Sequence, residues 1–391
     1  MTDDAVPLLS DLIADHDLGA RTGRRAFLAR ASALSLAIPG VGAALTACSP
    51  GKSGGGDSAP NAAGNSGAQT AVADTDRLGH HNSDSKLDSA VLKNAPPATS
   101  PAGSAATQAA PAPDFHRYDP ALPPLQGRRL QLHWHTREVP LRISDDIVVA
   151  AWTFEGDIPG PIVHCRVGDT VEFTLTNDSN IPHSMDFHAA QVNPKEAFKS
   201  VLKGQSHTFT FKPKYAGAFL YHCGTGPVLM HIGSGMFGAI IVSPLEGMPP
   251  AKDFVLIQNE YYLAPAVNGI RASDYSKMLT TSPDIVAFNG RPNQYMKDPI
   301  KVKLGDRVRF WVVIAGPSHQ CNFHVVGEQF DTVYLGALPG NSIRGVQTFA
   351  VAPGGGMVFD LVCDVAGEFP FVNHGFGHGQ IGAIGFLHVE G

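Results

Sequence analysis

The sequence has few cysteines and few charges, and each scarcity argues against a class of protein. Its five cysteines lie at positions 48, 165, 223, 321 and 363, and no two of them form a Cys-x-x-Cys pair. A zinc ribbon, an iron–sulfur cluster and a c-type haem are therefore disfavoured. Charged residues make up 16% of the 391 residues and the net charge is −6, which gives no reason to expect nucleic-acid binding.

Glycine, proline and histidine are plentiful instead. There are 42 glycines and 30 prolines, and from about residue 125 short apolar-alternating runs such as 147–154 and 170–176 are separated by turn residues. This pattern predicts an all-β fold built from sandwiches. The chain also has 17 histidines, an unusual count that directs attention to metal binding.

The N-terminal segment 1–48 is typical of a twin-arginine lipoprotein signal. Arg24 and Arg25 precede Phe-Leu and an apolar stretch too short to span a bilayer well, which ends in Leu-Thr-Ala-Cys48. This ending resembles a bacterial lipobox, so Cys48 would be the lipidated first residue of the mature protein. The alternative is an ordinary cleaved signal with an incidental cysteine. Either way, the protein is expected to be exported to the bacterial cell envelope.

A flexible, disordered low-complexity linker is expected over 49–124, followed by two similar domains at 125–247 and 248–391. Four pairs of segments match between the domains: Val167–Phe173 with Leu304–Phe310, Asp186–His188 with Asn322–His324, Ala216–Phe219 with Ala366–Phe369, and Met236–Ile240 with Gln380–Ile384. A period of about 140 residues is too long for a solenoid. A duplicated β-sandwich explains it.

The first domain carries a set of metal ligands in a characteristic order. His183 comes early, and Cys223, His231 and Met236 follow on what should be the last loop, before an apolar strand. Two imidazoles, a thiolate and a weak thioether are the ligands of a blue-copper electron-transfer site. The alternative is a buried cysteine with a chance histidine and methionine. Met230 is a rival for the axial position.

A second set alternates with the first. His188 lies five residues after His183, and His222 directly precedes Cys223. Side chains at odd separations in a strand point to opposite faces, so His188 and His222 should face away from the first set. Asp186 should share their face. The peptide between His222 and Cys223 would join the two sites by a short covalent path.

The second domain lacks the first set but keeps part of the second. Gln380 stands at the position matched to Met236, whereas His324 matches His188 and His374 is also available. These two histidines are not expected to reach His188 and His222 within one compact chain. They would do so across a subunit boundary in a ring.

The residues from about 125 to 391 resemble the copper-containing nitrite reductases. The resemblance rests on His183–Ala190, Tyr221–Cys223, His231–Met236, Phe323–Val326 and Val372–His374. It implies two tandem cupredoxin-type Greek-key sandwiches, as in the multicopper oxidase superfamily, in a homotrimer with one type 1 and one type 2 copper per subunit.

The resemblance also implies a role for each candidate residue. The type 1 copper would be held by His183, Cys223, His231 and Met236, and the type 2 copper by His188, His222 and the neighbouring subunit's His374. Asp186 and His324 would handle protons, and Val326 stands where members of the family often carry an Ile that shapes the substrate pocket. The Cys223–His231 loop is a residue shorter than in well-known members.

The expected reaction adds one electron and two protons to nitrite and yields nitric oxide and water. A cytochrome c or a small cupredoxin would reduce the type 1 copper, and the electron would cross Cys223–His222 to the type 2 copper. Two alternatives remain: a two-domain laccase-type oxidase, and a plain electron carrier with a vestigial second site. A laccase needs several His-x-His pairs, and His133-Trp134-His135 is the single one here.

Overall fold

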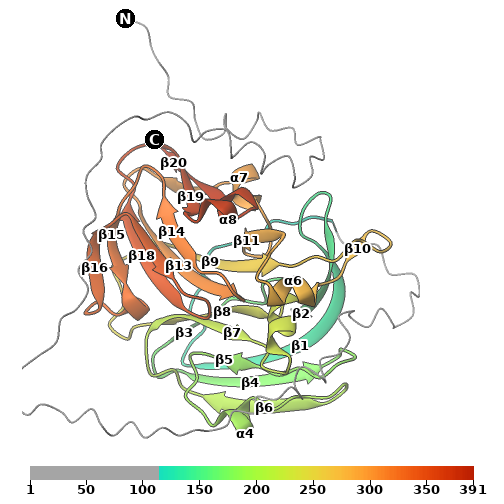
Figure 1. The fold of residues 1–391 in the computed structure, drawn as a ribbon. Coiled ribbons are helices and arrows are strands. Elements are labelled where there is room, and N and C mark those ends of the chain that lie inside the picture. Colours follow the sequence, from blue (N-terminus) through green and yellow to red (C-terminus); the bar gives the residue numbers. More distant parts are fainter. Residues whose placement is uncertain (1–113) are drawn as a thin grey trace, which may run out of the picture. The chain divides into compact units, whose positions relative to one another are not determined.

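The computed structural model describes residues 114–391, which form four β-sheets arranged as two β-sandwiches (Figure 1). Strands dominate and the helices have no more than six residues. The all-β prediction is therefore confirmed. The predicted signal, Cys48 and the linker up to residue 113 lie outside the described residues.

The first sandwich packs a five-stranded sheet of order β10-β2-β1-β4-β6 against a four-stranded sheet of order β3-β8-β7-β5. The strands β1 to β8 span Arg129–Arg142, Val148–Phe154, Val163–Arg166, Thr170–Asn177, Asp186–Phe187, Ser206–Phe211, Gly217–His222 and Phe237–Ser243. The short helices α4 and α5 span Pro194–Ala197 and Val228–Gly233. Strand β10, which pairs in parallel with β2, comes from the second half of the chain.

The second sandwich has a six-stranded sheet of order β11-β9-β13-β18-β15-β16 and a five-stranded sheet of order β12-β20-β19-β14-β17. The strands β9 to β14 span Lys252–Tyr261, Ile270–Arg271, Ile285–Phe288, Ile300–Lys303, Arg307–Gly316 and Cys321–Val325. The strands β15 to β20 span Phe330–Tyr334, Ser342–Val346, Thr348–Val351, Gly356–Val362, Gly367–Asn373 and Ile384–Glu390. Helices α6, α7 and α8 span Tyr275–Leu279, Gln294–Lys297 and Phe376–Gln380, and the 3-10 turn η1 spans Leu335–Ala337.

Alternating burial explains why these runs form strands. In β4, every second residue is buried along the whole strand, so one face packs into the sandwich and the other meets solvent. The interior of the first sandwich is rich in aromatic rings, among them Trp134, Phe173 and Tyr221. Phe310, Phe323 and Phe371 occupy the corresponding place in the second.

A third apolar core lies between the two sandwiches and joins them. Strand β8 contributes Ala239 and Ile241 to this shared core, while its intervening residue Ile240 packs inside the first sandwich. Strand β13 likewise contributes Trp311 and Val313. Strands buried on both faces fasten the sandwiches together, and β7 is one of the strands in contact with β13 and β18.

Residues 114–124, at the end of the predicted linker, contact both sandwiches. Ala121 forms a backbone bridge to Phe254 of the second, and the Tyr118 hydroxyl donates to the carbonyl of Gly160 in the first. In the part of the chain that the structure describes, no helix is long and apolar enough to cross a membrane.

Candidate metal centres

Strand β7 and Cys223, the residue that follows it, send their side chains alternately to two different places. Tyr221 and Cys223 point into the core of the first sandwich, whereas Ala218 and Leu220 point into the core that it shares with the second. His222 continues the second series and keeps 12% of its side-chain surface exposed. The predicted separation of His222 and Cys223 onto opposite faces is therefore observed.

Three of the residues predicted for the first centre meet in the interior of the first sandwich. The Nδ1 atoms of His183 and His231 lie 3.1 Å apart, and Cys223 Sγ lies 3.2 Å from the Nδ1 of His231 and 3.8 Å from that of His183. All three side chains are buried. They converge on one point with the atoms that metals bind.

Electrostatics keeps these imidazoles in their ligand form. Burial lowers the pKa of His183 to about 3, with the neighbouring His231 as a lesser cause, and lowers the pKa of His231 to about 4. Both rings are therefore neutral at pH 7, and neutral imidazole is the form that binds metals. Burial raises the pKa of the Cys223 thiol, against the weaker effect of backbone hydrogen bonds such as the one that Ser184 N–H donates to Sγ. Two neutral imidazoles beside one buried sulfur fit a copper ion.

The methionine candidates differ in burial. Met236 is fully buried, its N–H donates to the carbonyl of His231, and its own carbonyl accepts from the N–H of Cys223, both at 3.1 Å. Its backbone thus contacts that of two of the predicted ligands. Met230 is only half-buried. Sequence reasoning missed Trp152, whose ring centroid lies 5.0 Å from that of His231 and 6.0 Å from that of His183.

The second predicted group assembles on the other face of the same strand. Nε2 of His188 lies 3.1 Å from Nε2 of His222, and Oδ2 of Asp186 lies 3.9 Å from the latter. Asp186 and His222 are direct partners in the β5–β7 ladder, which explains why they meet. The 3.9 Å gap leaves the carboxylate free of a hydrogen bond to that nitrogen.

When both rings are neutral, their Nδ1 hydrogen bonds leave the two inner Nε2 atoms without protons. Nδ1 of His222 donates to the carbonyl of Cys223, and Nδ1 of His188 donates to the carbonyl of Gly354, each at 3.0 Å. The two Nε2 atoms then face each other as lone pairs. Two facing lone pairs repel unless a cation lies between them, so this pair fits a metal ion. Burial, the largest cause, lowers the pKa of His222 and thereby favours its neutral form.

The residues predicted from the second domain form a separate pair. The ring centroids of His324 and His374 lie 5.4 Å apart, and Nδ1 of His324 donates to the carbonyl of Gln347 at 2.6 Å. His374 is exposed, as is Val326 at 37%. Neither histidine joins the group of Asp186, His188 and His222 within the described residues of one chain.

Comparison with known proteins shows which family this chain resembles. The multicopper oxidase family model matches residues 130–247. A copper-containing nitrite reductase from Neisseria meningitidis is 36% identical over 285 residues, covering 70% of this chain and 73% of the relative. Among solved structures, the copper nitrite reductase from Nitrosomonas europaea has a TM-score of 0.63 and 36% identity, covering 67% of this chain and 94% of that one.

This chain belongs to the copper-containing nitrite reductases. The nitrite reductase from Thermus scotoductus is similar as well, with a TM-score of 0.62 and 28% identity. The recognition made from the motifs is therefore confirmed, as is the fold of two cupredoxin-type sandwiches.

Strand pairing in this nitrite reductase corrects one of the sequence matches between the two domains. Cys223 N–H donates to the carbonyl of Met236, and Asn373 N–H donates to the carbonyl of Ala383, both at 3.1 Å. The ladders agree, since Gly217 pairs with Val242 as Gly367 pairs with Val389. The counterpart of Met236 is therefore Ala383 and not Gln380. A short Gly-Ala-Ile repeat misplaced the match by three residues.

The same pairing makes Asn373 the counterpart of Cys223 and shows a similar arrangement of side chains at this position of the second domain. Nδ2 of Asn373 lies 3.1 Å from Nδ1 of His378, and the ring centroids of His378 and His319 lie 4.7 Å apart. In the first domain the corresponding rings are 5.0 Å apart. An amide therefore donates a hydrogen bond where the first domain has a sulfur.

The laccase alternative depended on His133 and His135, which lie on β1. Nε2 of His133 is 2.8 Å from the hydroxyl of Thr176, and Nδ1 of His135 is 2.7 Å from a carboxylate oxygen of Asp178. These polar partners lie beside the strand, and neither histidine belongs to a three-residue cluster of metal-binding side chains within 114–391. Nothing here supports a trinuclear copper site.

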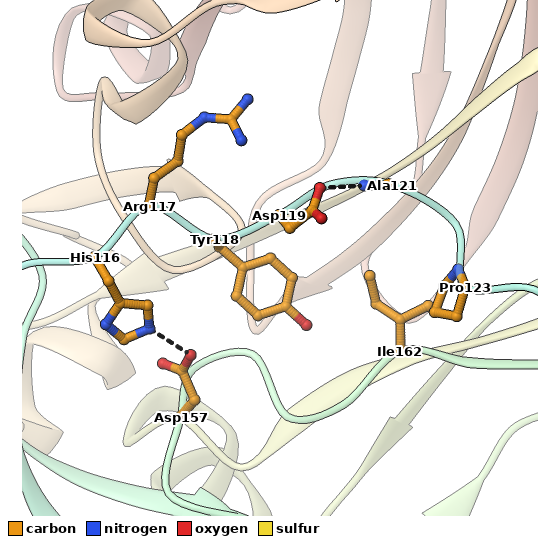
Figure 2. Close-up of a pocket in the computed structure, with 8 residues that line it drawn as sticks. All are labelled: His116, Arg117, Tyr118, Asp119, Ala121, Pro123, Asp157 and Ile162. Atoms are coloured by element: carbon orange, nitrogen blue, oxygen red, sulfur yellow. Dashed lines mark hydrogen bonds and ion pairs between the residues drawn. The ribbon is translucent and has the colours of Figure 1, made fainter.

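The structure has a surface cavity of about 340 Å³, and its lining contains no residue of either metal-binding group (Figure 2). The segment 116–123 forms one wall, and Asp157 and Ile162 form the other. His116 contacts Asp157 at 3.0 Å, and the buried guanidinium of Arg291 reaches the same carboxylate at 2.7 Å. Nε of Arg291 also donates to the carbonyl of His116 at 2.8 Å, so the start of the described chain is fastened to both sandwiches. None of the predicted site residues lines the cavity.

Proposed function

We propose that the protein reduces nitrite to nitric oxide, using one electron and two protons per nitrite and releasing water. The observation that supports this most is the pair of three-residue groups on opposite faces of β7, one with a thiol and one with a carboxylate. A thiolate group suits electron transfer, and imidazoles beside a carboxylate suit substrate chemistry. Membership in the family agrees with this assignment.

The proposed ligands follow from the two groups. A type 1 copper would be held by His183, Cys223, His231 and Met236. A type 2 copper would be held by His188 and His222, with His374 of the partner subunit as third ligand. When bound, the type 1 ion supplies a one-electron relay and the type 2 ion supplies a Lewis acid with an open position for substrate.

The residues of the chain supply the path and the protons. Cys223 and His222 are consecutive, so one peptide unit separates the two groups. Asp186 keeps 31% of its side chain exposed and can hold a protonated oxygen of nitrite by a hydrogen bond. His324 donates through Nδ1 to Gln347, which leaves its Nε2 to accept and release a proton. Val326 would border the substrate.

Nitric oxide formation tests the function. The full exported protein, loaded with copper and given nitrite with a reduced artificial donor, should release nitric oxide and consume one electron for each nitrite. Protein stripped of copper should be inactive and should recover on reloading. A copper-loaded protein that consumes dioxygen but forms no nitric oxide would contradict the proposal. The physiological donor would be a cytochrome c or a small cupredoxin, and the reaction would serve denitrification.

We further propose a homotrimer with shared type 2 sites, because His374 and His324 are set apart from His188 and His222 within one chain. Mixing a His188→Ala variant with a His374→Ala variant should restore activity. A neighbouring pair then combines one intact His188 with one intact His374, at about one quarter of all shared sites when equal amounts of the two variants assemble at random into trimers.

The control for this mixture is the pair of single variants, each assembled alone. Mass measurement must first establish that mixed trimers form. Mixed trimers with no more activity than either parent would rule out the shared site.

We propose export by the twin-arginine route to the periplasm or to the surface side of the outer membrane, with a lipid anchor at Cys48. Expressed in a bacterial host with its own signal, the protein should fractionate with membranes. A single acyl chain binds only at about 10⁴ M⁻¹, so firm retention requires the several chains of a bacterial lipoprotein. Cys48→Ser should release the protein or block its processing. A soluble wild-type protein whose mature N-terminus lies elsewhere would exclude the anchor.

A further inference from the structure

A glycine-rich turn of the second sandwich touches the second candidate centre. Residues 352–356, Ala-Pro-Gly-Gly-Gly, lead from β17 into β18, and the carbonyl of Gly354 accepts the hydrogen bond from Nδ1 of His188. These partners are 166 positions apart in the sequence. Nδ1 of His222, by contrast, donates to the carbonyl of the next residue. One imidazole is therefore oriented by the first sandwich and the other by the second.

The backbone of the turn is held from both sides. On the side of its own sandwich, Gly354 N–H donates to the carbonyl of Ile314 at 2.8 Å, and the carbonyl of Gly355 accepts from Ile314 N–H at 3.0 Å. On the other side Gly356 packs against β7, where a Cβ on Gly356 would lie 2.1 Å from the carbonyl oxygen of Ala218. Only a glycine permits this approach, and the atom it meets is backbone that cannot rotate away.

The position of Gly354 depends on the absence of a side chain as well. Its φ is +76°, in the left-handed region, and a Cβ there would lie 3.5 Å from Cε1 of His188. The turn thus presents a carbonyl to the imidazole at close range. Because Ala218 and His222 belong to the same strand, any displacement of β18 from β7 also moves the Gly354 carbonyl relative to both histidines.

We propose that the turn 352–356 is a positioning element for the second metal centre. The Gly354 carbonyl holds the Nδ1–H of His188, so that its Nε2 stays directed at His222. Packing of the second sandwich on β7 therefore controls the orientation of His188 and, with it, the metal affinity of the second centre. It does not affect the first centre. The inference rests on the proposed function only in taking this group as a copper site. An outer hydrogen-bond acceptor of a ligating histidine fixes its tautomer and its orientation, and losing such a partner costs about 10–100-fold in metal affinity.

Gly356→Ala tests the proposal. The new methyl group should push β18 from β7 and lengthen the Gly354–His188 contact. In the full copper-loaded protein, the affinity for type 2 copper, measured by competition with a chelator, should fall about 10–100-fold, and the type 2 electron paramagnetic resonance signal should change. The visible band of the type 1 copper should be unchanged. Gly340→Ala is the matched control, because Gly340 has ordinary φ and nothing within 4 Å of its Cβ position.

A second pair of variants decides the matter if Gly356→Ala does not fold. Gly354→Ala combines left-handed strain with the nearby His188, whereas Gly305→Ala imposes similar strain, at φ +84°, in open space. Only Gly354→Ala should alter the type 2 signal and affinity. Folded Gly356→Ala or Gly354→Ala protein with wild-type affinity and signal overturns the proposal. Neither readout requires turnover, so failure of nitrite reduction in the wild type would be recognised separately.

Discussion

Asp186→Asn should lower nitrite turnover about 10²–10⁴-fold, the usual contribution of a positioned acid–base group. The variant keeps the shape of the side chain and removes the group that can carry a proton. Asp186 pairs with His222 in the ladder but makes no hydrogen bond to its Nε2, so copper binding should survive. Copper content and the type 1 band should be normal. The wild-type rate should fall as pH rises, because the reaction consumes protons.

Asp178→Asn is a suitable control for this variant. Asp178 is an exposed carboxylate of the same sandwich that bonds His135 and lies outside the second group. Its replacement should leave turnover unchanged. If Asp186 merely braced the strand, the Asn variant would retain nearly full turnover with both coppers bound. That result would remove the proton-donor role and leave the ligand assignments standing.

Cys223→Ala should abolish the intense visible band of the thiolate-bound copper, and donor-driven turnover should fall to background. A second, pale copper should remain, because His188 and His222 lie on the other face of β7 and keep their own hydrogen bonds. Absorption and electron paramagnetic resonance spectra, together with the copper content per chain, measure both outcomes.

Cys165→Ala separates the loss of the ligand from the loss of a buried thiol. Cys165 is fully buried in the core of the same sandwich, as Cys223 is, so the two truncations disturb the packing in a similar way. The Cys165 variant should keep the band. A Cys223 variant that kept it would refute the assignment of the sulfur ligand.

The candidate ligands were predictable because their signals are local. Cys223, His231 and Met236 all lie in the short segment between β7 and β8. The alternation of a strand is enough to send His222 and Cys223 to opposite faces. Sheet formation was predictable for the same reason, since runs such as 170–176 show their alternation in the sequence.

The features that were missed depend on contacts between distant segments. No local pattern links Gly354 to His188, and the place of Trp152 beside His231 follows only from the packing of the sheets. The match of Met236 to Gln380 failed because a three-residue repeat carries less information than the hydrogen-bonded register of two strands. That register identifies Ala383.

The amide at Asn373 makes the divergence of the two domains difficult to reverse. Its Oδ1 accepts hydrogen bonds from the N–H groups of Asn322 and Gly375, at 3.1 and 3.0 Å. Its Nδ2 donates a hydrogen bond to Nδ1 of His378. Replacing Asn373 with cysteine would leave these partly buried donors poorly partnered, and position 383 would still lack a sulfur. A site like the first one could therefore form in the second domain only through at least two coordinated substitutions. The proposed entry of electrons is therefore expected to stay confined to the first domain as the sequence diverges.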